Sequence, residues 1–297
     1  MKDVKKLHMK RILITGSNGF IGKNIVEGLK NKYIIDSLTS EELDLTNTDK
    51  TYQYFKMKQY ECIIHTALYN GRKSGVKPER ILENNLRMYM NLLNNQDHYN
   101  KMIYFGSGAE FDKNYCMRNV NEDYFGKKIP KEVYGFTKYV MQQCCNNKDK
   151  IINLRLFGVY GKYEDYHSRF ISNACCRAIY NKPITINQNV VFSYLYIEDL
   201  IKVLPHFIEN AAVYKDYNVV PNEKTELVTI AKIIKEISGK KIPIIIKKEG
   251  MNLEYTGSNN RLISQIGDFK FTPMNKGIQT IYSWYEKNRD LIDEKLL

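Results

Sequence analysis

Long apolar runs are missing from this sequence of 297 residues: none approaches the roughly 20 residues that a helix needs to cross a bilayer. The basic opening, residues 1–16, holds only a short apolar stretch before a glycine, which is too short for the core of a secretion signal. Repeats, low-complexity tracts and linker-like segments are also missing. With 43% hydrophobic and 26% charged residues, the composition is that of a soluble globular protein, so we expect a cytoplasmic chain without a membrane partner.

No C-x-x-C pair occurs among the six cysteines, which stand at positions 62, 116, 144, 145, 175 and 176. This spacing indicates neither a zinc site nor a disulfide scaffold, so we expect reduced thiols and no metal. The net charge of +12 has two interpretations, a compositional bias or a field that attracts nucleic acid or an anionic ligand. Because the lysines are spread along the whole chain, we favour the bias and expect no nucleic-acid partner.

What the sequence does have is a strand, a glycine turn and a helix at its start. The β-branched run 12–15 leads into G-x-x-G-x-x-G, then a helical segment and a second strand at 33–38. In such a βαβ unit the glycines allow a tight turn, approach of a pyrophosphate and close helix packing, and the helix N-terminus offers N–H groups to phosphates. The cofactor-binding residues predicted here are Gly16, Ser17, Asn18, Gly19, Phe20, Ile21 and Gly22.

Strand-like and helix-like segments then alternate along the chain. Strands are predicted at 60–68, 101–108 and 151–161, and helices at 80–95 and 133–147. This alternation is typical of a doubly wound α/β fold, a parallel Rossmann sheet with helices on both faces. Ligands in such folds bind beyond the carboxyl ends of the strands.

Ser107 falls at such a strand end, between Gly106 and Gly108. A hydrolase nucleophile would stand in G-x-S-x-G and lead directly into a helix, whereas these glycines are one place too close and a polar segment follows. The histidines stand at positions 8, 65, 98, 167 and 206. His65 lies within an apolar strand, where a core histidine is favoured over a general base. A serine triad is therefore poorly supported.

Tyr134 and Lys138 are a better match for Ser107. Four residues apart on a helix, they lie on one face. A cation beside a phenol stabilises the phenolate and brings the pKa of the tyrosine toward neutrality, as an acid–base catalyst requires. We therefore predict Tyr134 as the acid, Lys138 as its cation and Ser107 as a hydrogen-bond donor.

Together with the glycine turn, these three residues resemble the extended short-chain dehydrogenase/reductases (the NAD-dependent epimerase/dehydratase family), most closely the nucleotide-sugar 4-ketoreductases similar to GDP-L-fucose synthase. The resemblance covers nearly the whole chain and implies that Asn85 supports the active site and that Lys138 also binds the nicotinamide ribose. It implies a dinucleotide-binding domain at 1–161 with 191–220 returning to it. Residues 162–190 and 221–297 are then a smaller α/β domain for the nucleotide sugar, in a homodimer.

Departures from the family pattern narrow the expected chemistry. Ala109 stands where GDP-L-fucose synthase has an epimerising cysteine, and Arg169 stands where it has a histidine; His167 is the nearest substitute. Gly108 and Ala109 also replace the Asp-Glu pair of the 4,6-dehydratases. The resemblance thus implies NAD(P)H-dependent reduction of the C4 carbonyl of a 4-keto-6-deoxy sugar without 3,5-epimerisation, in surface-polysaccharide biosynthesis. Alternatives are a 4-epimerase that keeps NAD bound, a bifunctional 3,5-epimerase/4-reductase and a non-catalytic dinucleotide sensor.

The choice between NADP and NAD depends on the end of the second strand. Asp36 there is the kind of acid that binds the ribose of NAD, whereas Thr39 and Ser40 suit the 2′-phosphate of NADP. Because these hydroxyls follow, NADP is expected, with NAD as the alternative. Asp44, before Leu45, either meets the adenine or caps a turn.

The nucleotide of the substrate is less defined. Arg177 matches a family contact to the diphosphate, but a solvated arginine is the alternative. Gly158 and Phe192 replace two further contact residues of the family. By resemblance we favour GDP over dTDP, UDP and CDP, on a hexose or a heptose. The predicted substrate contacts are Gly108, Ala109, His167, Arg169 and Arg177.

Overall fold

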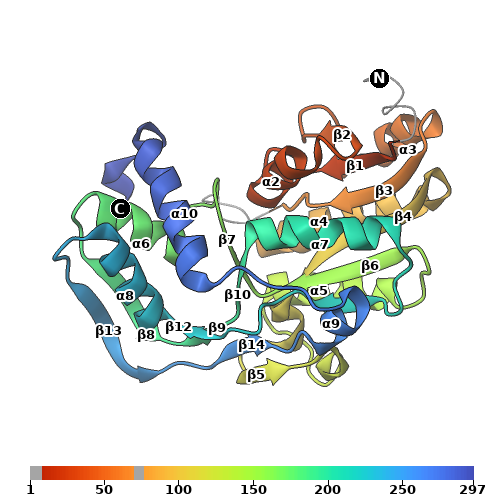
Figure 1. The fold of residues 1–297 in the computed structure, drawn as a ribbon. Coiled ribbons are helices and arrows are strands. Elements are labelled where there is room, and N and C mark those ends of the chain that lie inside the picture. Colours follow the sequence, from red (N-terminus) through yellow and green to blue (C-terminus); the bar gives the residue numbers. More distant parts are fainter. Residues whose placement is uncertain (1–8, 70–76) are drawn as a thin grey trace.

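A computed structural model describes residues 9–69 and 77–297; His8 and the start of the basic opening lie outside this part. Its largest component is a parallel sheet in the order β11-β6-β4-β3-β1-β2 (Figure 1). The strands are β1 (Arg11–Thr15), β2 (Ile34–Leu38), β3 (Tyr60–His65), β4 (Tyr99–Ser107), β6 (Ile151–Leu156) and β11 (Asp216–Asn218). Most of these strands are almost continuous apolar runs, because helices cover both faces of a parallel sheet.

Helices cover both faces of this sheet. On one face, α2 (Phe20–Leu29) and α7 (Ile197–Glu209) pack over Ile12 and Ile14 of β1. On the other face, Leu13 belongs to a core shared with three helices, α3 (Thr48–Lys56), α4 (Pro78–Asn94) and α5 (Val133–Cys145). Alternate residues of one strand thus enter different cores, and the predicted doubly wound α/β fold is confirmed. Among the described residues, no helix is long and apolar enough to cross a membrane.

The C-terminal half builds a smaller lobe beyond one end of the sheet, green to blue in Figure 1. Its helices are α6 (Phe170–Ile179), α8 (Leu227–Ser238) and α10 (Met274–Lys287), whereas α9 (Asn260–Ile266) packs against β11 of the large sheet. Its short strands form two pairs: β7 (Gly158–Tyr160) with β10 (Tyr194–Tyr196), and β8 (Ile184–Asn189) with β13 (Ile244–Met251). A four-stranded sheet has the order β12 (Thr225–Glu226), β9 (Val191–Phe192), β14 (Tyr255–Gly257) and β5 (Met117–Val120). One apolar cluster continues from the sheet into this lobe, so the predicted division into two domains stays a prediction.

The single strand predicted at 151–161 is wrong in its second half. β6 ends at Leu156, and β7 leaves the large sheet to pair with β10. Phe157, at the break, packs its ring 5.0 Å from that of Tyr255. Burial of this aromatic ring between the sheet and the smaller lobe turns the chain away from the sheet. The break therefore places an aromatic wall beside the end of β4.

Candidate active site

The glycine turn between β1 and α2 has the geometry that a dinucleotide requires. Gly16 has a left-handed backbone (φ +67°), and a Cβ there would lie 2.5 Å from the Cα of Ala67. A Cβ on Gly22 would lie 2.4 Å from the carbonyl oxygen of Gly16, which shows how closely α2 packs on the turn. Gly19 caps α2 without a side-chain hydrogen bond. The first N–H groups of the helix are therefore open to phosphate oxygens.

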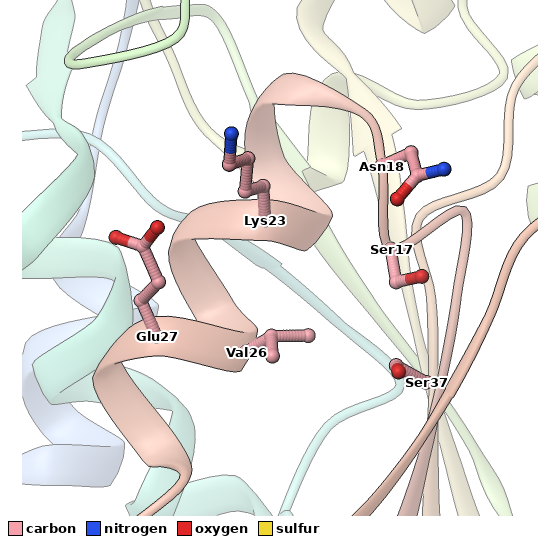
Figure 2. A pocket seen from close by; sticks show the side chains of 6 residues that line it. All are labelled: Ser17, Asn18, Lys23, Val26, Glu27 and Ser37. Atoms are coloured by element: carbon pink, nitrogen blue, oxygen red, sulfur yellow. The ribbon is translucent and has the colours of Figure 1, made fainter.

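A cavity of about 400 Å³ lies between α2 and the end of β2. It is lined by Ser17, Asn18, Lys23, Val26, Glu27 and Ser37. Figure 2 shows Val26 and Ser37 pointing toward one another across it. Ser17 and Asn18 were predicted cofactor residues, whereas the other four were missed. The alternation along β2 was the available signal, because Ser37 must face away from its neighbour Asp36.

Asp36 is engaged on the opposite side of β2. Its carboxylate accepts hydrogen bonds from Arg11 Nη2 at 3.0 Å and from the Tyr60 hydroxyl at 2.7 Å. Burial alone would raise the pKa of Asp36, but these two partners lower it below its ordinary value. The carboxylate is thus not placed to bind the ribose hydroxyls of NAD from this cavity.

The loop after β2 contributes less than the sequence predicted. Thr39 and Ser40 are not among the residues that line the cavity. Asp44 caps the local turn, because its Oδ1 accepts from the backbone N–H of Thr46 at 2.9 Å and from its hydroxyl at 2.8 Å. The Leu45 side chain is buried in the core beneath the sheet. Of the two interpretations of Asp44, the structure shows the turn cap.

Ser107 and Tyr134 meet at the carboxyl end of β4. Ser107 is the last residue of that strand and is buried, and Tyr134 stands in the first turn of α5. The Ser107 hydroxyl lies close enough to the phenol to influence the pKa of Tyr134. Burial of the phenol raises the pKa of Tyr134 above its ordinary value, and Ser107 and the positive charge of Arg169 oppose this rise. The pair is therefore a protonated acid beside a hydroxyl donor.

The prediction that Lys138 brings the pKa of Tyr134 toward neutrality is wrong. Lys138 is buried, and its Nζ donates to the carbonyl oxygen of Phe105 at 2.8 Å. The cation that lowers the pKa of Tyr134 is Arg169, at the N-cap of α6. Because the Lys138 ammonium is directed to a backbone carbonyl, its charge serves the end of β4 rather than the phenol.

Neither His65 nor His167 is placed as a base at this site. His65 is buried, and its Nδ1 lies 2.8 Å from the Thr15 hydroxyl. Burial lowers the pKa of His65 to about 3, so it is a neutral core histidine, as the sequence indicated. His167 is exposed, and its backbone N–H donates to Asp165. Arg169 rather than His167 is the neighbour that acts on Tyr134.

Two other predicted residues have defined backbone partners. The buried Asn85 side chain exchanges hydrogen bonds of 2.9 Å with both the N–H and the carbonyl of Tyr69, and so fixes the chain after β3. Arg177 donates to the carbonyl oxygen of Pro183 at 2.5 Å. This contact replaces the solvated arginine considered above, and it shows no link between Arg177 and the Ser107–Tyr134 pair.

The smaller lobe brings Tyr255 to the same place, which the sequence analysis missed. Tyr255 is buried, which raises the pKa of its phenol, and the nearby Ser107 hydroxyl opposes this rise. A Cβ on Gly108 would lie 2.7 Å from the Tyr255 hydroxyl. Lys113 Nζ lies 5.7 Å from the ring centres of both Tyr134 and Tyr255. No local pattern distinguishes Tyr255 among 23 tyrosines, because only strand β14 carries it to Ser107.

Ser107, Tyr134 and Tyr255 thus present three hydroxyl groups at one point, with Arg169 nearby as a positive charge. Such a group can donate hydrogen bonds and one proton to an oxygen of a bound molecule. Ala109, two residues after Ser107 and also buried, has only a methyl group and can neither remove nor return a proton. The arrangement suits protonation of oxygen and lacks a base at position 109.

Comparisons with known proteins agree with this geometry. A sequence model of the NAD dependent epimerase/dehydratase family matches residues 12–220. GDP-L-colitose synthase of Yersinia pseudotuberculosis is 26% identical over 309 aligned residues, which cover 94% of this chain and 100% of that protein. Two solved structures share the fold. The GDP-mannoheptose C4 reductase from Campylobacter jejuni with NADP bound has a TM-score of 0.82 at 18% identity, covering 94% of this chain and 98% of that one. A GDP-L-fucose synthetase from Naegleria fowleri has a TM-score of 0.83 at 19% identity, covering 96% and 95%. The chain described here belongs to the NAD-dependent epimerase/dehydratase family.

Proposed function

We propose that this enzyme uses NADPH to reduce the C4 carbonyl of a nucleotide-linked 4-keto-6-deoxy sugar, without 3,5-epimerisation. One observation carries the proposal: Ser107 and Tyr134 meet at the end of β4, while the residue two places after Ser107 is Ala109. The hydroxyl pair supports reduction of a carbonyl, since it can polarise and protonate the oxygen. A methyl group cannot take the carbon-bound proton that epimerisation removes.

The residues of the site have distinct tasks in this reaction. The dinucleotide, when bound, supplies the hydride. Ser107 donates a hydrogen bond to the carbonyl oxygen, and Tyr134 gives that oxygen a proton as negative charge develops on it. Arg169 stabilises the resulting phenolate, in keeping with its effect on the pKa of Tyr134. Lys138, below the end of β4, binds the nicotinamide ribose. Stabilising charge where it develops is usually the largest part of such catalysis.

The preference for NADPH is supported by the two faces of β2. Asp36 is occupied by Arg11 and Tyr60, so the acid suited to the ribose of NAD is turned away. Ser37 and Ser17 instead direct hydroxyl groups at the cavity, where they suit a 2′-phosphate. NADP is also the cofactor named for the Campylobacter jejuni reductase that shares this fold.

A GDP-linked hexose or heptose is the substrate that we propose. Several relatives with the same fold or with sequence identity along nearly the whole chain are named for GDP-colitose, GDP-fucose and GDP-mannoheptose, whereas others are named for ADP-heptose, UDP-glucose and dTDP-4-dehydrorhamnose. Sugars of this kind are built into surface polysaccharides, which is the pathway we propose for this enzyme.

The proposal is tested with GDP-4-keto-6-deoxy-mannose made by a dehydratase in deuterated water. NADPH oxidation above the dehydratase control, without enzyme-dependent deuterium at C3 or C5, is expected. Deuterium at those carbons would establish the bifunctional epimerase–reductase instead. Tightly retained NAD in the purified protein, with no net NADPH consumption, would favour a 4-epimerase.

A further inference from the structure

An ion pair is buried directly beneath the catalytic turn, which we define as residues 106–110. The side chains of Glu110 and Arg155 are both 0% exposed, and Arg155 Nε donates to Glu110 Oε2 at 2.7 Å. Replacing such buried pairs by apolar residues is often neutral for stability or even stabilising, because desolvation of the two charges is costly. Stability alone is therefore a weak reason for this buried ion pair. Its position under Ser107 suggests a functional role.

Glu110 holds the backbone of the catalytic serine. Its Oε1 accepts the N–H of Ser107 at 2.9 Å, and the Ser107 hydroxyl oxygen accepts the N–H of Ala109 at 3.2 Å. These reciprocal bonds form a capping box at the short 3-10 helix that starts at Gly108. The other carboxylate oxygen is bound by Arg155, on β6. One side chain thus connects the serine backbone to the neighbouring strand.

Asn153 adds a second connection from the same strand. Its Oδ1 accepts the N–H of Gly106 at 2.9 Å, and its Nδ2 lies 3.3 Å from each oxygen of Glu110. A Cβ on Gly106 would lie 2.2 Å from Asn153 Oδ1 and 2.3 Å from Glu110 Oε1. Only glycine lets the two side chains come this close to the turn. The N–H groups of Gly106 and Ser107 are both fixed by β6.

These bonds determine where the Ser107 proton can point. A serine hydroxyl has one proton to donate. Its oxygen already accepts from Ala109, so the proton is left for the side where Tyr134 and Tyr255 lie. The negative charge of Glu110 also raises the pKa of both Tyr134 and Lys138, which favours their protonated forms. Glu110 thereby acts on each of the three predicted catalytic groups without being next to the substrate site.

The far side of Arg155 offers a matched control. Its Nη2 donates to Asp216 at 2.9 Å and its Nη1 to Asn218 at 3.1 Å, both on β11. Asp216 bonds onward to Arg261 at 2.6 Å. Asp216 is therefore a carboxylate on the same guanidinium with no hydrogen bond to the catalytic turn among the described residues.

We infer that Glu110 is a positioning residue of the reductase site: held by Arg155 and Asn153, it fixes the backbone of Ser107 so that the serine proton is directed at the sugar carbonyl. The inference rests on the proposed function, because it assigns Ser107 the role of carbonyl donor.

Steady-state kinetics of three variants test this inference. Glu110→Ala should lower kcat about 100-fold, the scale expected when a catalytic group is displaced by about 1 Å, with the KM of the sugar changed less than threefold. Glu110→Gln keeps one acceptor and should lower kcat about tenfold. Asp216→Asn should leave kcat within threefold of wild type. The inference would be overturned if Glu110→Ala and Asp216→Asn lowered kcat to the same extent. It would also be overturned if Glu110→Ala changed only the KM.

Amide hydrogen exchange gives a second readout that needs no substrate. Peptides covering residues 103–112 should exchange faster in Glu110→Ala than in wild type or Asp216→Asn, and unchanged exchange would overturn the inference. If the wild type reduces none of the nucleotide 4-keto sugars, the proposed function fails, while this measurement still decides whether Glu110 holds the turn. If Glu110→Ala does not fold, Glu110→Val combined with Arg155→Met removes both charges. That variant should bind NADPH and show the same kcat loss, and full activity would refute the role.

Discussion

The ammonium of Lys138 donates a hydrogen bond of 2.8 Å to the carbonyl oxygen of Phe105, two residues before Ser107. This contact ties α5 to the end of β4. Burial lowers the pKa of Lys138 to about 8, and the negative charge of Glu110 opposes the shift. The neighbouring His65 has a pKa of about 3 and stays neutral. Lys138 is therefore a buried group whose pKa lies in an accessible pH range.

Activity should fall as Lys138 loses its proton. Below pH 8 the ammonium is present to bind the nicotinamide ribose, so kcat/KM should decline about tenfold per pH unit above roughly pH 8. Measuring kcat/KM from pH 6 to 10 checks this. Lys138→Arg keeps its charge throughout this range and serves as the control, which should lack the decline. A flat wild-type profile would contradict the assignment.

The free energy of unfolding should rise with pH over the range in which the activity falls. The pKa of Lys138 is about 8 in the folded state and near 10.5 when unfolded. Between these values the unfolded chain binds more protons, so the free energy of unfolding rises with pH, by about 3 kcal/mol in total. Urea unfolding from pH 7 to 10 of wild type and Lys138→Met measures it. The difference in unfolding free energy between the two proteins separates the effect of Lys138 from that of the tyrosines. Parallel curves of unfolding free energy against pH would show that the pKa of Lys138 is not shifted.

Removing the phenol of Tyr134 should stop the reaction but not cofactor binding. Tyr134→Phe loses the proton donor, so kcat should fall at least about 100-fold. NADPH binding, followed by its fluorescence, should stay within twofold. Tyr139→Phe makes the same change on the same helix, at a ring that stacks on Phe125 with centres 4.8 Å apart, and should keep full activity. Turnover by Tyr134→Phe would remove this residue from the mechanism.

The cofactor preference should respond to Ser37. Ser37→Asp puts a carboxylate into the cavity beside α2, where it repels a 2′-phosphate and suits ribose hydroxyls. We expect the KM for NADPH to rise at least about tenfold and that for NADH to fall. Ser40→Asp, which adds the same charge outside the cavity lining, is the control. Equal effects of the two variants would mean that net charge, not position, is responsible.

Tyr255 should matter for the rate although it comes from the smaller lobe. Tyr255→Phe removes the hydroxyl that lies near Ser107 while keeping the ring that packs on Phe157. We expect kcat to drop about tenfold at unchanged thermal stability. Tyr124→Phe is the comparison, since that ring packs edge-on against Phe111 in the same cluster and makes no hydrogen bond to Ser107 in the part of the chain that the structure describes. Similar kinetics for both variants would reduce Tyr255 to a packing residue.

Features that depend on neighbours in the chain were predictable. The turn at Gly16 follows from the spacing of the glycines. The sheet and its helices follow from the way strand-like and helix-like patterns of apolar residues alternate along the chain. The meeting of Ser107 and Tyr134 was also expected, because a strand end and a following helix start share one edge of an α/β sheet. The single strand predicted at 151–161 is instead two strands, because the chain breaks at Phe157, which packs on Tyr255, and β7 pairs outside the large sheet.

The sequence by itself determined the fold class, the dinucleotide turn and the positions of the hydroxyl donor and the acid, since each is a local pattern with a fixed geometry. Only the tertiary structure decided which charges act on them. It set the charge of Arg169 to act on Tyr134, directed Lys138 to the carbonyl of Phe105, turned Asp36 away from the cofactor cavity and put Glu110 on Arg155. Electrostatic and hydrogen-bond partners are set by distance in space, and side chains far apart in the chain become neighbours only when the sheet has formed.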